Sequence, residues 1–361
     1  MKLPKFEVEQ WMTDYENDAV YNLTDTCIPA LTVQELLAMD EAGDFQNVRL
    51  DYGAITGDQR VKEEILKLYQ SGDTDSITTS QGCLQGNEMA METLLGAGDH
   101  VITFKPGYQA FSDYPRALGC TVTELPLYED DNWQPSVTDL EEAMKQKTKL
   151  IILNDPNNPT GIRFNDAFVS EMIRLAEKQG TWILSDEVYS DPRYPSISDL
   201  YEKGISTGSL SKMYSLAGLR FGWIKGPHDL IRKINERRDY SIISTGPLAD
   251  TLALIALKHK EQLLERAGAV IQANRKIIQE WLNEEPLCSV NLPEFCTVSF
   301  LKYEGDIPSK KLAEDLLKKN GVFFVPGECF FHENHLRLSL TADPEVMKNG
   351  LQILSRYLHQ K

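Results

Sequence analysis

The pattern that decides the fold reads Leu150-Ile-Ile-Leu153, then Phe168-Val-Ser-Glu-Met-Ile-Arg-Leu-Ala-Glu177, then Thr181-Trp-Ile-Leu184. The first and last stretches are short, apolar and contain β-branched residues, which favours strands. The middle stretch has apolar residues at helical spacing and is closed by Gly180, a residue type that commonly ends a helix. A strand, a helix and a strand within about 35 residues predict a βαβ unit. We therefore expect a mainly parallel sheet with helices on both faces.

The flanking sequence extends this α/β pattern and then departs from it. Two more predicted strands, Val101–Phe104 and Thr121–Leu125, precede the βαβ unit. After about residue 245, long helical stretches and short strands predict a small α+β domain, whose last helix begins at Asp343-Pro344. The predicted division is an N-terminal segment that joins the small domain or a partner subunit (1–45), a large α/β domain (46–245) and the small domain (246–361).

The composition favours a globular protein and excludes some classes of partner. The chain has 361 residues, of which 42% are hydrophobic, and a formal net charge of −17 at pH 7. That charge argues against nucleic acid or an anionic membrane as a partner. The six cysteines are scattered, without a Cys-x-x-Cys pair or a Cys/His cluster, so we expect a reduced, cytoplasmic protein without a bound metal. The N-terminal sequence has no apolar core of a signal peptide, and no membrane span is expected.

The stretch Ser209-Leu-Ser-Lys212 is followed by Arg220, and the grouping suits a site for a phosphorylated aldehyde. A lysine amine forms a Schiff base with a carbonyl, while hydroxyl groups and a guanidinium bind phosphate. Pyridoxal phosphate (PLP) is the common cofactor that offers both groups. A loop lysine that is only a solvated charge is an equally good interpretation of this stretch alone.

Polar residues follow two neighbouring predicted strands, at the edge where parallel sheets bind ligands. Asp186 is a candidate to pair with a protonated pyridine nitrogen, and Tyr189 comes three residues later. Asn158 belongs to a turn rich in Asn, Pro and Gly, and its amide can bind either the turn or a ligand oxygen. A helix cap at Asp186 and a purely structural turn around Asn158 are the alternatives.

The loop around Gly82 and Cys83 precedes a predicted helix over residues 87–95. Free N–H groups at a helix N-terminus bind phosphate, although glycines precede many helices. Tyr108, after Pro106-Gly107, is a candidate to stack on a planar ring, or else an aromatic residue of the core.

Four motifs, taken together, resemble those of the class I/II aminotransferases of PLP fold type I, in the aspartate aminotransferase superfamily. They are Asn158-Pro-Thr-Gly161, Ser185-Asp-Glu-Val-Tyr189, Ser209-Leu-Ser-Lys212 and Leu216-Ala-Gly-Leu-Arg-Phe-Gly-Trp223. The resemblance covers nearly the full length, from about Asn22 to the C-terminus. It implies an α/β fold with a mainly parallel, seven-stranded-type sheet, and PLP as the cofactor.

The resemblance also implies roles for individual residues around the cofactor. Lys212 would be the Schiff-base lysine and general base, kept partly neutral by nearby cationic character, and Asp186 would pair with the pyridine nitrogen. Further contacts are implied for the phosphate (Gly82, Cys83, Ser209, Ser211, Arg220), the ring hydroxyl (Asn158, Tyr189) and the ring face (Tyr108).

On the substrate side, Arg337 matches the arginine that binds the substrate carboxylate, close to Asn158. Tyr52 matches a tyrosine that reaches the phosphate of the other subunit's cofactor, which implies a homodimer with shared sites. Family members often carry a glycine in the stretch that here reads Asn22-Leu-Thr-Asp-Thr-Cys27. Our hypothesis is that Asp25 faces the substrate side chain and favours a cationic amino acid such as arginine or lysine. Capping of a turn by Asp25 is the alternative.

The implied activity is transfer of an amino group between an L-amino acid and a 2-oxo acid by ping-pong kinetics. A PLP-dependent lyase or cyclase, acting by C–S β-elimination or by ring closure, is the alternative. The same residues around the cofactor serve all of these reactions, so the motifs alone leave them open.

Overall fold

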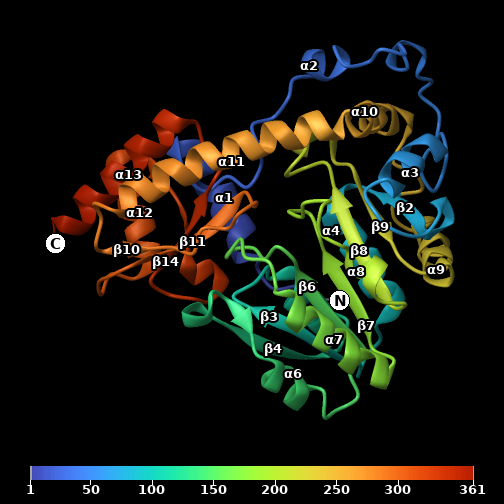
Figure 1. Ribbon diagram of the computed structural model, residues 1–361, viewed down its shortest axis with the longest axis horizontal. Coiled ribbons are helices and arrows are strands. Elements are labelled where there is room, and N and C mark those ends of the chain that lie inside the picture. Colours follow the sequence, from blue (N-terminus) through green and yellow to red (C-terminus); the bar gives the residue numbers. More distant parts are fainter. Residues whose placement is uncertain (1, 361) are drawn as a thin grey trace.

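The computed structural model describes residues 2–360 and contains two main sheets, with the long helix α11 (Lys260–Leu282) reaching from one to the other (Figure 1). The strands of the larger sheet lie, in spatial order, at β2 (Ile77–Ser80), β9 (Gly222–Lys225), β8 (Gly204–Ser209), β7 (Trp182–Asp186), β6 (Leu150–Asn154), β3 (His100–Lys105), β4 (Thr121–Tyr128) and β5 (Gln134–Pro135). Strands β8, β7, β6, β3 and β4 are parallel, whereas β9 is antiparallel to both its neighbours. The predicted mainly parallel α/β fold is confirmed, and the short hairpin strand β5 makes the sheet eight-stranded.

The two faces of this sheet bury separate cores, because successive side chains of a strand point to opposite faces. Ile151 and Leu153 of β6 belong to one core, and Leu150 and Ile152 belong to the other. Among the helices packed into the first core are α6 (Val137–Ala143), α7 (Asp166–Gln179) and α8 (Ile197–Leu200). Those packed into the second are α4 (Gly82–Leu94), α5 (Ala110–Ala117) and α9 (His228–Arg238). Burial on both faces explains why the strands read as nearly continuous apolar runs.

The smaller sheet is antiparallel and follows the order β10 (Cys288–Ser289), β11 (Val298–Tyr303), β14 (His335–Ser339) and β13 (Val325–Pro326). Helices α12 (Ser309–Asn320) and α13 (Pro344–His359) accompany it. Asp343 caps α13, since its carboxylate accepts hydrogen bonds from the N–H groups of Glu345 and Val346. The strands of the two main sheets occupy separate parts of the chain, residues 77–225 and 288–339. The domain boundaries at residues 45 and 245 stay predictions.

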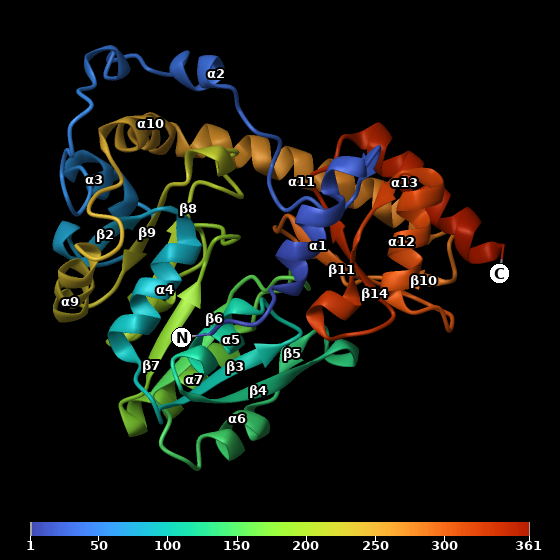
Figure 2. The ribbon, with the colours of Figure 1, turned by 180° about the vertical axis from the view of Figure 1, so that it is seen from behind.

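The N-terminal segment is more regular than the sequence indicates. Helix α1 (Glu7–Tyr15) buries Val8 and Trp11, and the Trp11 indole N–H donates to the Phe324 carbonyl at 2.9 Å. Strand β1 (Tyr21–Asn22) pairs in parallel with β12 (Val322–Phe323). Figure 2 shows α1 between the two sheets.

The chain then leaves the body of the molecule as an arm. The arm carries α2 (Val33–Leu37), passes α10 (Pro247–Lys258) and returns at α3 (Gln59–Leu66) (Figure 1). None of the helices within residues 2–360 combines the length and the apolar character that a membrane crossing requires.

Gly161 fixes the turn after β6 against the smaller sheet. Its φ is +73°, in the left-handed region, and a Cβ at this position would overlap the carbonyl oxygen of Val298 in β11. Only glycine meets both conditions, so the turn that carries Asn158 is held at a defined place between the two sheets.

Gly161→Ala is therefore expected to lower the free energy of unfolding by about 3 kcal/mol or more, because backbone strain and overlap add. Gly98→Ala is the matched control: its φ is +89° and nothing lies within 4 Å of a Cβ built there. The control should cost only the backbone strain of about 1–2 kcal/mol. Urea denaturation of both variants measures the difference, and equal losses would show that the approach to Val298 is unimportant.

Candidate functional site

One cavity of about 370 Å³ lies at the carboxyl ends of β6, β7 and β8, against α1 and the smaller sheet. Ten of the residues predicted from the sequence line it: Cys83, Tyr108, Asn158, Asp186, Tyr189, Ser209, Ser211, Lys212, Arg220 and Arg337. Gly82 lies directly beside it, because a Cβ on this residue would come within 2.6 Å of the Arg220 guanidinium. The structure thus brings together residues that are more than 250 positions apart in the sequence.

Asp186 is the last residue of β7 and is only 6% exposed. Its Oδ2 accepts a hydrogen bond from Asn87 Nδ2 at 2.7 Å, and its Oδ1 accepts one from the Val188 N–H at 3.1 Å. Burial raises the pKa of this carboxyl, and these hydrogen bonds oppose the rise. Within residues 2–360 no cation forms a salt bridge with it. A buried carboxylate of this kind is suited to bind a protonated nitrogen of a ligand.

Sequence analysis missed the residues that orient Asp186. Thr207 Oγ1 donates to Asn87 Oδ1 at 2.7 Å, so that Asn87 turns its amide nitrogen toward the carboxylate. The Cys83 thiol donates to Thr207 Oγ1 at 3.1 Å, and burial raises the pKa of this thiol well above its usual value. The predicted helix start at residue 87 hid this arrangement. Helix α4 begins at Gly82, which places Cys83 and Asn87 one turn apart on the same face.

Lys212 meets the N-terminal segment at the other side of the cavity. Its Nζ donates to Thr26 Oγ1 at 2.6 Å, lies 3.6 Å from Cys27 Sγ and stands 5.9 Å from the centre of the Tyr189 ring. Burial opposes the charge of Lys212, but Tyr189 and Cys27 outweigh it and raise the pKa of the ammonium. The raised pKa favours a charged Lys212, contrary to the partly neutral amine that we expected. Arg337 does lower the pKa of Lys212, as expected of a nearby cation. Burial also raises the pKa of Tyr189, to about 12.

The phosphate-binding residues predicted from the sequence meet at the N-terminus of α4. Arg220 has a left-handed backbone, with φ +54°, which aims its side chain back toward Gly82. Its Nη1 donates to the Ala217 carbonyl at 3.1 Å and to Ser211 Oγ at 3.5 Å. Ser209 Oγ accepts from the Ser211 N–H at 3.2 Å. A guanidinium, two hydroxyl groups and free helical N–H groups together suit a phosphate.

The far end of the cavity holds Arg337, which is 3% exposed and comes from β14 of the smaller sheet. Its Nε and Nη2 donate to Thr24 Oγ1 and the Thr24 carbonyl at 3.2 and 3.1 Å. Opposite it, the Tyr108 hydroxyl donates to Glu9 of α1 at 2.9 Å. Glu9 was not among the predicted site residues, because the first 45 residues show no helical pattern strong enough to predict α1.

Two predicted residues lie outside the lining of this cavity. Tyr52 is 68% exposed on the arm. Asp25 is exposed, and its Oδ1 accepts a hydrogen bond from the Cys27 N–H at 3.0 Å, as in a capped turn. The roles expected of both residues stay predictions.

The residues present fit the expected cofactor, PLP. In the part of the chain that the structure describes, the buried Asn158 Oδ1 has no hydrogen-bond partner, and no cation forms a salt bridge with the buried Asp186 carboxylate. A ring with a hydroxyl group, a protonated nitrogen and a phosphate offers a partner to Asn158, to Asp186 and to the Arg220 region. The cavity has room for such a molecule and for a small amino acid beside it.

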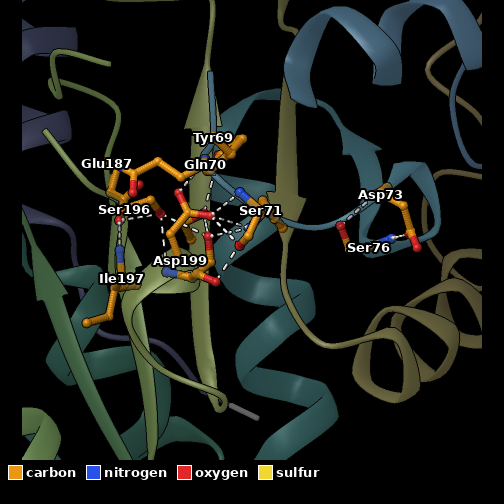
Figure 3. A network of polar contacts seen from close by, with 12 residues as sticks. Tyr69, Gln70, Ser71, Asp73, Ser76, Glu187, Ser196, Ile197 and Asp199 are labelled. Carbon is orange, nitrogen blue, oxygen red and sulfur yellow. Dashed lines mark hydrogen bonds and ion pairs between the residues drawn. The ribbon is translucent and has the colours of Figure 1, made fainter. Parts of the chain in front are cut away.

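Figure 3 shows a network of polar contacts around Asp199 and Glu187, the second of which directly follows Asp186. Asp199 accepts from the N–H groups of Gln70 and Ser71 at 3.0 and 3.1 Å and forms an ion pair with Lys225 at 3.1 Å. Glu187, next to Asp186, accepts from the Ile197 N–H at 3.0 Å. Burial raises the pKa of Glu187 to about 8.

Comparison with known proteins finds relatives along most of the chain. The family model described as aminotransferase class I and II matches residues 20–354. The crystal structure of a PLP-dependent aminotransferase from Streptococcus suis is 36% identical, with a TM-score of 0.95 over 100% of this chain and 99% of that one. Capreomycidine synthase from Streptomyces vinaceus is 26% identical over 366 residues, which cover 99% of this chain and 94% of the relative. A PLP-dependent cyclase of 22% identity shares the fold, with a TM-score of 0.91 over 100% of this chain and 98% of that one.

Glu187 makes the stability of the fold depend on pH. The folded carboxyl keeps its proton up to about pH 8, whereas the unfolded one releases it near 4.5, so folding takes up a proton between these values. Stability should therefore fall as the pH rises through this window. Glu187→Gln removes this pH dependence. Between pH 5 and pH 8, the free energy of unfolding of the variant should rise relative to that of the wild type by on the order of 2 kcal/mol.

Urea denaturation across this pH range measures the difference. Glu202→Gln, at an exposed glutamate, is the matched control and should follow the wild type. Parallel curves for Glu187→Gln and the wild type would show that Glu187 is ionised in the folded protein at neutral pH.

Proposed function

Because the chain belongs to the class I and II aminotransferases, we propose that it is a PLP-dependent aminotransferase that moves an amino group between an L-amino acid and a 2-oxo acid. PLP is the cofactor of this family and of this chain. The observation that carries the proposal is the arrangement in one cavity of an amine, a buried carboxylate and a guanidinium, on Lys212, Asp186 and Arg337.

The proposed roles follow from the position of each group. The cofactor, when bound, supplies an electron sink for the substrate's α-carbon. When PLP is bound, Lys212 would hold its aldehyde, and the Lys212 amine would take and return the proton of the substrate's α-carbon. Asp186 would keep a proton on the ring nitrogen, which favours the sink. Tyr189 and Asn158 would hold the ring hydroxyl. Because donor and acceptor use the same groups in turn, the kinetics are ping-pong.

Arg337 is proposed to bind the substrate carboxylate. Its Nε and Nη2 are held by Thr24, and Nη2 also lies 3.9 Å from Met12 Sδ, so Nη1 is the nitrogen proposed to meet a planar anion. Acidic groups stand nearby: burial and the charges of Asp25 and Glu9 raise the pKa of Glu16, while Arg337 lowers it. This negative surrounding supports the proposal that Asp25 favours a substrate with a cationic side chain.

A second candidate function is that of a lyase or cyclase, and the names of two related proteins support it. A relative that aligns with 99% of this chain is named a synthase, and a cyclase has the same fold. Loss of a leaving group or ring closure would use the same Lys212 and Asp186. Only the identity of the product separates these reactions from transamination.

A homodimer with shared sites is also proposed. Leu50 and Tyr52 of the arm are 86% and 68% exposed, and Tyr240 and Leu248 near the start of α10 are 95% and 45% exposed. Gly53 packs against Pro247, so these two groups adjoin each other. Exposed apolar surface of this extent is typical of an interface. A second copy seated there would bring Tyr52 toward the partner's phosphate site.

A cytoplasmic location is proposed as well. All six cysteines are free thiols in the structure, in keeping with a reducing compartment.

Transamination predicts a change of cofactor absorbance that depends on the amino acid added. Single amino acids added to the PLP-bound protein should bleach the visible band with one class of donor and yield an equal amount of 2-oxo acid. Lys212→Ala should lower the rate at least about 10⁴-fold, since it removes both the bond to the cofactor and the base. Ammonia released while the band persists would assign a lyase instead.

The same panel of donors tests the role of Asp25. Asp25→Ala should reduce the preference for arginine over alanine by about tenfold, the value of one ion pair of roughly 1.4 kcal/mol. An unchanged preference would show that Asp25 only caps its turn.

The proposed dimer predicts a mass in solution of twice 40.9 kDa. Leu50→Asp should shift the protein toward the monomer and weaken PLP binding, because Tyr52 then loses the partner's site. Leu200→Asp, at a leucine that is 44% exposed on α8, is the matched control. Light scattering after size exclusion measures the mass, and a wild-type monomer would contradict the proposal.

A further inference from the structure

Three possible metal ligands meet at a place outside the cofactor cavity. Glu129 begins the 3₁₀ helix η4 (Glu129–Asp131) at the end of β4 in the larger sheet. His332 and His335 follow the 3₁₀ helix η6 (Gly327–Phe330), next to β14 in the smaller sheet. One ligand atom from each residue lies within 4.8 Å of the others. Residues about 200 positions apart therefore form a group of two imidazoles and one carboxylate.

His335 presents an unused nitrogen to this group. The side chain is 2% exposed, and its Nδ1 lies 2.8 Å from the Glu333 carbonyl. A carbonyl only accepts, so Nδ1 carries the hydrogen and Nε2 of the neutral ring carries a lone pair. Among the described residues, no hydrogen-bond geometry satisfies the buried Nε2, which faces Glu129 Oε1 from 3.4 Å. A nitrogen that faces a carboxylate oxygen is stabilised by a cation between them, either a proton or a metal ion.

The walls of the group hold both rings in place. Phe300 stacks on the His335 ring at 4.6 Å, and Trp133 meets the His332 and His335 rings edge-on at 5.3 and 5.5 Å. The His332 N–H donates to the Gly327 carbonyl at 3.0 Å, and a Cβ on Gly327 would overlap the His332 carbonyl oxygen. These contacts limit how far the two imidazoles can move, and the aromatic rings limit access of water.

We propose that Glu129, His332 and His335 bind a divalent transition metal ion, with Zn²⁺ as the ion that best suits two imidazoles and one carboxylate. Zinc takes four ligands at about 2 Å, so three protein ligands leave one position open to water. Small rotations of the half-buried His332 and Glu129 side chains bring the three atoms to that distance.

Lys302 defines which carboxylate oxygen the ion would use. Its Nζ lies 3.2 Å from Glu129 Oε2, whereas His335 faces Oε1. The ammonium therefore orients the carboxylate from behind and leaves Oε1 for the metal, in the manner of a second coordination shell. The positive charge of Lys302 near the site weakens the binding of a cation, but it leaves Glu129 Oε1 free to bind the ion.

Bound in this way, the ion would join the hairpin at the end of β4 to the smaller sheet. The two parts already touch here, since Asn291 Nδ2 approaches the Glu129 carbonyl at 3.5 Å. A metal ion would add a fixed link between the two sheets, remote from Lys212.

Zinc binding to the PLP-loaded, full-length protein tests this inference. The protein is treated with EDTA, dialysed and titrated with Zn²⁺ against a chromogenic chelator. We expect one ion per chain in the wild type. Glu129→Gln and His332→Ala should each weaken binding by at least about tenfold, the lower bound for loss of a supporting group. Both positions are only half buried, which favours folded variants.

His228→Ala is the matched control, because His228 is an exposed histidine that pairs with Asp73 in another part of the molecule. It should bind zinc as the wild type does. No stoichiometric binding by the wild type would overturn the inference. So would full binding by both Glu129→Gln and His332→Ala, since the ion would then lie at other groups, such as the cysteines.

Discussion

The burial of the Asp186 carboxylate is the constraint on which the architecture around the cavity depends. A negative charge that has lost its water is tolerated only where hydrogen bonds and a cation replace the hydration. Asn87 supplies one of these hydrogen bonds, and it does so because α4 begins at Gly82 rather than further along. The same first turn of α4 stands against Arg220. One helix start therefore orders both ends of the space in which the cofactor lies.

A short N-terminal stretch couples the two cationic groups of the site. Thr24 accepts hydrogen bonds from Arg337, and Thr26, two residues later, accepts one from Lys212. The Ile28 N–H also donates to the Lys212 carbonyl at 3.1 Å. Movement of this stretch would shift both groups together, so a few residues of backbone set the distance between the Lys212 amine and the Arg337 guanidinium. The smaller sheet positions Arg337 through Thr24 as well as through β14.

Much of the fold and part of the site could be predicted because they depend on local patterns. The apolar runs at 150–153 and 181–184 place Asn158 and Asp186 at neighbouring strand ends, and the confirmed family and cofactor follow from motifs around them. Asn87, Thr24 and Glu9 escaped prediction because their partners lie 99, 313 and 99 residues away. No spacing rule connects such positions. Helix α1 has no capping side chain and is stabilised by tertiary packing of Val8 and Trp11, which a local pattern does not reveal.

Glu129, His332 and His335 also could not be grouped from the sequence, because they are brought together only by the fold. Read along the chain, the two histidines are three residues apart and resemble ordinary surface residues, and the glutamate belongs to an acidic turn. The three side chains lie close together only because the β4 hairpin contacts the smaller sheet in the folded protein. The sequence predicted no metal ligands for this reason, and the roles of the other site residues stay predictions until the variants above are measured.

The pairing of the first residues with the last strands also governs when the site can come into existence. Thr24 and Tyr21 leave the ribosome some three hundred residues before their partners Arg337 and Val322. The large sheet can fold while synthesis continues, since its strands end at Lys225. The N-terminal stretch around Thr24 remains without its partner Arg337 during the synthesis of some three hundred residues. The contact between Thr24 and Arg337, which closes one side of the cavity, can therefore form only after residue 337 has been made.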